Sequence, residues 1–88
     1  MLLGFNDNIA YKDNVYHVQT EDNGLKNPVI ITLIYSKGEI ISSKKTGYAH
    51  VAGDSDYLEK VLILMKEQHR EMINRLLAGE FTAERNKS

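Results

Sequence analysis

The side chains best suited to chemistry are gathered in one short segment, His17-Val18-Gln19-Thr20-Glu21-Asp22. In an extended chain alternate side chains point to the same face, so His17, Gln19 and Glu21 are expected to lie in a row. An imidazole, an amide and a carboxylate in a row could hydrogen-bond a polar ligand or act as acid and base. The alternative is a solvent-facing polar stripe on a strand whose other face is buried. Because the segment offers neither an evident nucleophile nor oxyanion donors, we predict no catalytic residues and a non-enzymatic protein.

The three histidines, His17, His50 and His69, do not form a recognisable metal motif. None has a ligand at the spacing of His-x-x-x-His, and the chain contains no cysteine. We therefore expect no bound metal and no cofactor. His69 falls within an apolar helical repeat, where it is either a partly buried member of the repeat or a contact for a partner.

A second polar segment, Ser42-Ser43-Lys44-Lys45, places two cations near Tyr48. Cations beside an aromatic ring can contact phosphate or nucleic acid, whereas lysines on an edge strand discourage unwanted strand pairing. The formal net charge of -1 argues against the basic face of a dedicated nucleic-acid binder, so we expect no nucleic-acid partner. The candidate ligand or partner contacts are polar residues of the predicted strands and helix: His17, Gln19, Glu21, Lys44, Lys45 and His69.

The elements that position these residues follow from a change of apolar period near Gly53. Before it, apolar residues alternate or form short β-branched runs, and after it they recur at steps of three and four. Lys12-Asp13-Asn14 is expected to form the first turn, because Asp and Asn tolerate positive φ angles. The pattern predicts four strands and one helix, at about 5–12, 15–21, 29–36, 39–46 and 55–78.

The predicted helix has recognisable ends and an apolar seam. Asp56 and Glu59 have the spacing of a capping box, although Asp54 or Ser55 could cap the helix instead, and Gly79 suits the left-handed position that closes many helices. The seam is either core or a helix–helix contact across a dimer. Residues 80–88 are expected to form a flexible tail, which leaves 1–79 as one domain. The expected seam residues are Leu58, Leu62, Met65, His69, Met72 and Leu76, widened by Val61, Ile73 and Leu77.

These elements predict an α+β fold, in which a four-stranded antiparallel meander is followed by one long C-terminal helix packed on one face. Antiparallel neighbours are expected because all three strand connections are short enough for hairpins. A single helix covers only one face of the sheet. Val29 to Tyr35 is apolar on both faces except at Thr32, which is typical of a strand covered on both sides. We therefore predict that a second copy covers the other face, giving a homodimer.

Composition narrows the class of protein further. With 88 residues, 42% of them hydrophobic, the chain is one domain with a thin core. No apolar run approaches the roughly 18 residues of a membrane-spanning helix, so no membrane association is expected. The first residues have no charged start and no long apolar stretch, so we predict no signal peptide and a cytoplasmic protein.

Several of these segments together resemble a group of short, uncharacterised bacterial proteins without a known activity. The group has an aromatic-His-Val-Gln-Thr-Glu-Asp strand, a glycine-ended loop with Asn-Pro, a lysine-rich strand and a C-terminal helix carrying Glu-Gln-His. The resemblance implies an architecture and no mechanism. It spans roughly residues 9 to 79 and rests on residues 16–22, Asn27-Pro28, Ile31-Thr32, Gly38, Ile40, Lys44, Lys45, Tyr48 and Glu67-Gln68-His69.

The leading functional hypothesis is a non-enzymatic protein-interaction or regulatory module that acts as a homodimer and has an unidentified protein partner. Its contact surface would be the uncovered sheet face, the helix seam, or both. The alternative is a small-ligand or metal-binding protein that uses the polar strand face of His17, Gln19 and Glu21, with His69 as a further contact.

Overall fold

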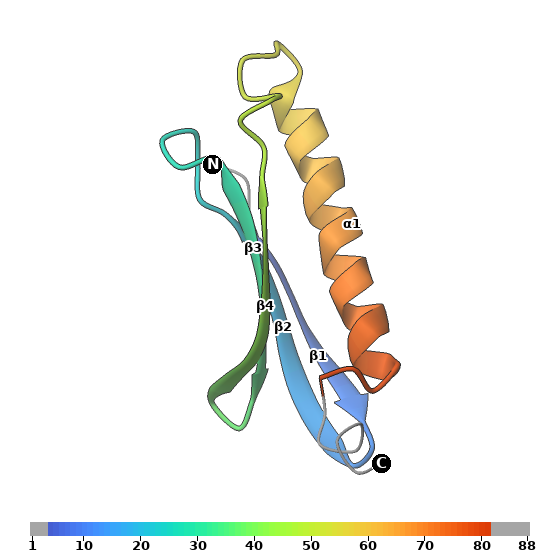
Figure 1. Cartoon of the computed structure of the whole chain (residues 1–88). Coiled ribbons are helices and arrows are strands. Elements are labelled where there is room, and N and C mark those ends of the chain that lie inside the picture. Colours follow the sequence, from blue (N-terminus) through green and yellow to red (C-terminus); the bar gives the residue numbers. More distant parts are fainter. Residues whose placement is uncertain (1–3, 82–88) are drawn as a thin grey trace.

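The structure, a computed structural model, describes residues 4–81 as an open antiparallel sheet with one helix on one face (Figure 1). The strands are hydrogen-bonded in the order of the sequence, which is a meander. The predicted α+β fold with one C-terminal helix is therefore confirmed. The elements are β1 (Phe5–Tyr11), β2 (Asn14–Asp22), β3 (Val29–Ser36), β4 (Glu39–Gly47) and α1 (Tyr57–Leu77).

Two tight turns join β1 to β2 and β3 to β4. Their central residues have positive φ angles, 51° and 66° at Lys12 and Asp13, and 52° and 83° at Lys37 and Gly38. Two-residue hairpins favour such angles because their twist matches that of the strands. The first turn lies one residue earlier than expected, since Asn14 already pairs with Tyr11 as the first residue of β2.

The pairing of β3 with β4 contains one irregularity that changes which side chains face the helix. Ile34 is opposite Ser42, whereas Tyr35 is opposite Ile40, so Ile41 is an extra residue in β4. Such a bulge shifts the alternation of side chains along its strand by one position.

The start of α1 differs from the predicted capping box. The helix begins at Tyr57, and the side chain of Asp56 makes no capping hydrogen bond. Lys60 instead holds both flanking carboxylates, with Nζ 2.7 Å from Asp54 Oδ2 and 3.4 Å from Asp56 Oδ1. The prediction that Asp56 and Glu59 form a capping box was therefore wrong.

The end of α1 confirms the predicted role of Gly79. Gly79 has a φ of 82°, its N–H donates to the carbonyl of Leu76, and the N–H of Glu80 donates to that of Arg75. This pair of bonds is the Schellman arrangement, which satisfies the last carbonyls of the helix. Phe81 packs beside the core, so it is not part of a free tail. Residues 82–88 of the predicted tail lie outside the described residues.

The core lies between α1 and the sheet and is divided into two apolar clusters. One cluster is built from Tyr16, Val18, Ile34, Met72 and Leu76. The other is built from Ile30, Tyr48, Val61 and Met65. On β1, β3 and α1, which contribute to both clusters, the inward-facing residues between the clusters are polar, namely Asp7, Thr32, Gln68 and His69, and they belong to the first candidate site.

The helix seam is occupied by the sheet of the same chain. Met65, His69, Met72 and Leu76 are all buried, as the periodicity predicts for core residues. A helix–helix contact across a dimer is therefore not available to this seam. Two members expected on it are instead solvent-exposed, Leu58 at 44% and Leu77 at 47%.

Candidate functional site

The first candidate site is a chain of hydrogen bonds that runs beneath α1 between the two apolar clusters. At one end, on β1, Asp7 Oδ2 lies 2.7 Å from His69 Nε2. His69 Nδ1 lies 2.7 Å from Thr20 Oγ1, and that hydroxyl lies 2.6 Å from the hydroxyl of Thr32. These contacts link α1 to β1, β2 and β3.

The same chain continues through Gln68 to the far side of the sheet. Gln68 Nε2 donates to Thr32 Oγ1 at 3.0 Å and to the backbone carbonyl of Lys44 at 3.2 Å. The hydroxyl of Thr46 donates to Gln68 Oε1. Every strand thus contributes a member to this set, which we call the polar layer and which consists of Asp7, Thr20, Thr32, Thr46, Gln68 and His69.

One consistent set of donors and acceptors satisfies the whole polar layer. Gln68 donates to Thr32, Thr32 can donate to Thr20, and Thr20 can donate to the unprotonated Nδ1 of His69. His69 Nε2–H then donates to the carboxylate of Asp7, so the ring is neutral in this arrangement. Among the described residues no buried polar side-chain atom is left without a partner. A fully satisfied network of this kind favours one particular packing of helix on sheet.

Thr20, His69 and Asp7 align a hydroxyl, an imidazole and a carboxylate, as nucleophilic triads do. Thr20 has 0% of its surface exposed, so a substrate has no approach to its hydroxyl. Its hydroxyl is also engaged by a second hydroxyl, that of Thr32. The arrangement therefore favours a structural role over chemistry.

A second buried polar contact ties the loop before α1 to the end of β2. The hydroxyl of Tyr48 donates to Asp22 Oδ1, which also accepts the N–H of Gly24 at 2.9 Å. Tyr48 is fully buried, and burial together with the neighbouring Asp22 carboxylate raises the pKa of its phenol to about 12. The ring is therefore not available as an aromatic surface beside Lys44 and Lys45.

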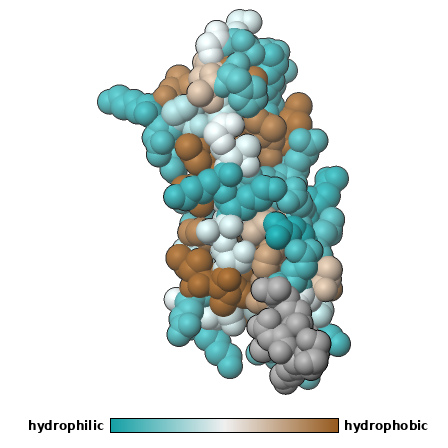
Figure 2. Space-filling view, in the orientation of Figure 1, coloured by the Kyte–Doolittle hydropathy of each residue, from teal (hydrophilic) through white to brown (hydrophobic). Residues whose placement is uncertain are grey.

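The second candidate site is the sheet face opposite α1, which we call the open face (Figure 1). Its middle column comes from β3 and consists of Val29, Ile31, Leu33 and Tyr35, all partly exposed. At one end of the molecule, Figure 2 shows hydrophobic surface on the β4 side, over the segment where Ile40 and Ile41 are 55% and 36% exposed. No described helix or loop replaces α1 on this side.

Polar residues flank that apolar column on both sides. The register places Gln19 and Ser43 beside Leu33, and Glu21 and Lys45 beside Ile31. His17 lies beside Tyr35, with ring centroids 6.1 Å apart. The open face is thus an apolar strip with polar margins, a pattern that resembles the core and rim of protein interfaces.

The ring of His17 is held by the neighbouring strand β1. Its Nδ1 lies 3.0 Å from Asn8 Oδ1, and its Nε2 lies 3.1 Å from Asn6 Oδ1. Both ring nitrogens are therefore engaged within the sheet. No group of three or more potential metal-ligating side chains lies together among residues 4–81. The predicted metal-binding alternative gains no support from this geometry.

The six predicted contact residues do not form one site. His17, Gln19, Glu21 and Lys45 lie on the open face, and the predicted alignment of the first three is confirmed. Lys44 and His69 lie on the helix side. Lys44 Nζ lies 2.6 Å from Glu71 Oε2, and this contact lowers the pKa of the Glu71 carboxyl.

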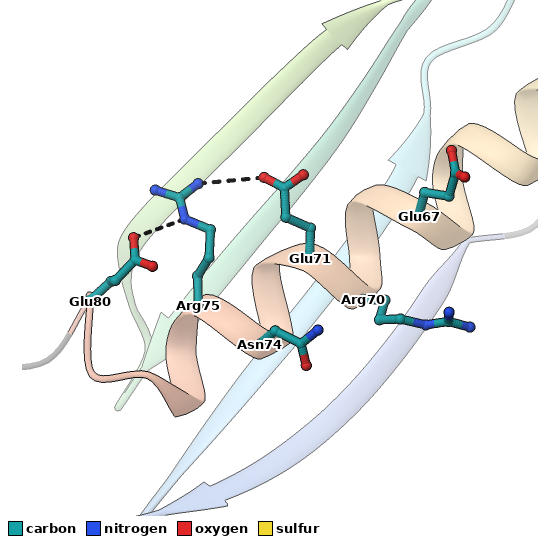
Figure 3. A pocket seen from close by; sticks show the side chains of 6 residues that line it. All are labelled: Glu67, Arg70, Glu71, Asn74, Arg75 and Glu80. Carbon is teal, nitrogen blue, oxygen red and sulfur yellow. Dashed lines mark hydrogen bonds and ion pairs between the residues drawn. The ribbon is translucent and has the colours of Figure 1, made fainter.

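Open depressions flank α1. In one of them, lined mostly by charged residues, Figure 3 shows Arg75 between Glu71 and Glu80 while Arg70 extends elsewhere. These three ion-paired residues are half of its lining, and such exposed networks have little effect on stability. Another, of about 260 Å³, lies beside His69. A smaller one, of about 140 Å³, lies between α1 and β4 beside Gln68 and Thr46 of the polar layer. All of them are open to solvent, so none is a preferred binding site.

Comparisons with protein-family models, with curated proteins and with solved structures give no match for this chain. No helix within residues 4–81 is both long and apolar enough to cross a membrane. The geometry of the two sheet faces is therefore the basis for a functional conclusion.

Sequence reasoning missed part of the polar layer. Asp7 and Thr46 were not singled out, and Gln68 was named only as part of the resemblance, although it is only 5% exposed and lies at the centre of the layer. One signal was present, because Thr20 and Thr32 are polar residues at positions whose neighbours on the same face are apolar. Buried hydroxyls need partners, so they predict polar residues on whatever element covers them.

Proposed function

We propose that the protein is a homodimeric, non-enzymatic interaction module whose contact surface is the open face of the sheet. The observation that carries this proposal is the apolar strip of β3 on a face that α1 does not cover. Ile31 and Leu33 are held in the middle of that face by rigid strands on both sides. Exposed apolar patches with polar margins are typical of protein–protein contact sites.

The shape of the domain supports a missing second layer. Its Cα radius of gyration is 14.3 Å, against about 12 Å expected for a compact domain of this length. It measures 47 × 22 × 18 Å, which is long and thin. Most sheets are covered on both faces or solvated on a clearly polar one, and the open face of β3 is not polar. A second copy would supply the missing layer.

The size of the open face sets the expected affinity. Four strands spaced by about 4.8 Å and about eight residues long give a surface of roughly 20 Å by 25 Å on each copy. Two such faces would bury on the order of 1,000 Å², near the lower limit of specific protein contacts. We therefore expect a dimer that dissociates in the micromolar range, and a regulatory partner could compete for the same face.

The test is sedimentation equilibrium of the full chain over protein concentrations from about 1 μM to 1 mM. The wild type is expected to change from monomer to dimer within this range, and Leu33→Asp to remain a monomer throughout. Ile63→Asp is the matched control, because Ile63 is 55% exposed on the outer side of α1. A wild type that stays monomeric at 1 mM would contradict the proposal.

The competing hypothesis is small-ligand binding by His17, Gln19 and Glu21. It predicts a bound species in native mass spectra of the purified protein. Since Asn6 and Asn8 already engage the ring of His17, the geometry favours the dimer.

A further inference from the structure

We infer that the second copy binds with its two-fold axis along β3, so that Glu21 of each copy faces Lys45 of the other. This inference rests on the proposed dimer and specifies its symmetry. It follows from the register, which places the two opposite charges at the same level on either side of Ile31.

Glu21 and Lys45 have no ion-pair partner within the described part of the chain. They are two strand spacings apart, about 10 Å, with the side chain of Ile31 between them. Both are exposed. On the helix side Lys44, Lys60 and Arg75 are paired with carboxylates, while other helix charges such as Lys66 and Arg70 are solvated without an ion pair to any described residue. Glu21 and Lys45 differ from those solvated charges in their position, because among residues 4–81 they are the one acid and the one base on the open face and lie at the same level on either side of its apolar strip.

A two-fold axis along β3 supplies that partner for both charges at once. Such a rotation keeps the level along the strands and exchanges the two sides of β3, so the β2 side of one copy covers the β4 side of the other. Sheets packed face to face lie about 10 Å apart with strands nearly aligned. At that separation the long side chains of Glu21 and Lys45 of a second copy can meet. The symmetry produces two such pairs.

The residues at the level of Leu33 fit the same arrangement, whereas at the level of Tyr35 the symmetry places His17 over the apolar Ile40. On the axis, Ile31 and Leu33 meet their own counterparts and form an apolar centre. At the level of Leu33, Gln19 faces Ser43 of the second copy, and both can form hydrogen bonds. β1 lies beyond the overlap, so this symmetry buries only about three quarters of the area given above for four strands, and the polar residues Asn6 and Asn8 border the interface.

The competing symmetry, with the axis across the strands, leaves Lys45 unpaired. It would place β4 of one copy over β4 of the other. The helix-distal side of β4 carries Ile40, Ser43 and Lys45 but no carboxylate. Charge complementarity therefore favours the axis along β3.

The test is a charge exchange between copies. Glu21→Lys and Lys45→Glu should each weaken the dimer by at least about tenfold at low salt, because each creates two like-charge contacts. An equimolar mixture of the two variants should dimerise within a few-fold of wild type, and almost all dimers should be mixed. Native mass spectrometry with one variant ¹⁵N-labelled measures the proportion of mixed dimers. The double variant E21K/K45E should dimerise alone, and thermal unfolding monitors the folding of every variant.

The possible failures are distinguishable. If both single variants dimerise like wild type and mix in the statistical ratio of about 1:2:1, the axis along β3 is wrong while the homodimer stands. If wild type does not dimerise at 1 mM, the proposed function and this inference both fail.

Discussion

The two faces of this sheet are built from the same strands and similar residues, yet they differ in almost every physical property. Ile30 and Ile34 on the helix side are completely buried, whereas Ile31 and Leu33, the residues between them, are only partly covered. The difference comes from connectivity, because the one long helix can lie on only one side. Residue type alone thus does not decide burial in a two-layer domain, and an apolar residue on the other side is a potential contact.

The largest effect expected from this difference compares neighbours on β3. Ile34→Ala should lower the free energy of unfolding by about 2–5 kcal/mol, because it leaves a cavity in a closed apolar cluster. Leu33→Ala should lower the free energy of unfolding of the isolated subunit much less, and its main effect should be a weaker dimer. Urea unfolding at a protein concentration below dimer formation measures the first effect, and sedimentation measures the second. Equal losses of subunit stability would mean that the open face is already as well covered as the core.

The fold could be predicted because its signals are local. Strand alternation, positive-φ turns and the helical repeat each depend on residues close together in the sequence. The alternation of β2, with His17, Gln19 and Glu21 on one face, was predicted correctly, and the other face is buried. The capping box failed because Lys60 competes for the carboxylate of Asp56, and spacing alone does not reveal such a competitor.

The candidate site was less predictable, because its contacts join distant segments. Thr20 and His69 are separated by 49 residues, and Asp7 and His69 by 62. No local period indicates which hydroxyl meets which imidazole.

Loss of a side-chain hydroxyl should also affect stability more on the helix side of the sheet than on the open face. Thr20→Val keeps the shape of the side chain but leaves His69 Nδ1 without its hydrogen-bond partner. We expect a loss of about 1–3 kcal/mol in the free energy of unfolding, the usual effect of an orphaned buried polar group. Ser43→Ala, on the open face, is the control and should change subunit stability by less than about 0.5 kcal/mol. Chemical denaturation of both variants measures the difference, and an unaffected Thr20→Val would show that water replaces the lost donor.

The buried phenol of Tyr48 should make the free energy of unfolding depend on pH in the alkaline range. The pKa of Tyr48 is raised from 10.0 to about 12, so the folded state retains its proton where the unfolded state loses it. The resulting stability is complete below pH 10 and is lost as the pH rises toward 12. Between pH 10 and 11 the wild type should lose about 1 kcal/mol more than Tyr48→Phe. Denaturation curves at pH 8, 10 and 11 test this.

Tyr35→Phe is the control for that experiment, since Tyr35 is a phenol on the open face. This variant retains Tyr48, so its stability should keep the pH dependence of the wild type. If Tyr48→Phe showed the same decline above pH 10, ionisation of the buried Tyr48 phenol would not be the source of the effect.

The smallest expected effect concerns Lys44 and Lys45, which are consecutive in the sequence but lie on opposite faces of the sheet. Without the extra residue Ile41 in β4, simple alternation from Ile40 would place Lys44 on the open face and Lys45 beneath the helix. The bulge reverses this assignment, so Lys44 pairs with Glu71 and Lys45 lies beside Ile31.

Lys44→Met should therefore lower subunit stability, but by less than about 1 kcal/mol, because the ion pair with Glu71 is partly exposed. The pair holds the pKa of Glu71 low, so this contribution is present at neutral pH and is lost as the pH falls through that pKa. Lys45→Met should leave subunit stability unchanged and weaken the dimer. Unfolding curves at pH 7 and in acid, together with sedimentation, separate the two outcomes. If Lys45→Met lowered subunit stability and Lys44→Met weakened the dimer, the bulge would lie elsewhere in β4, and Lys44 rather than Lys45 would lie on the open face.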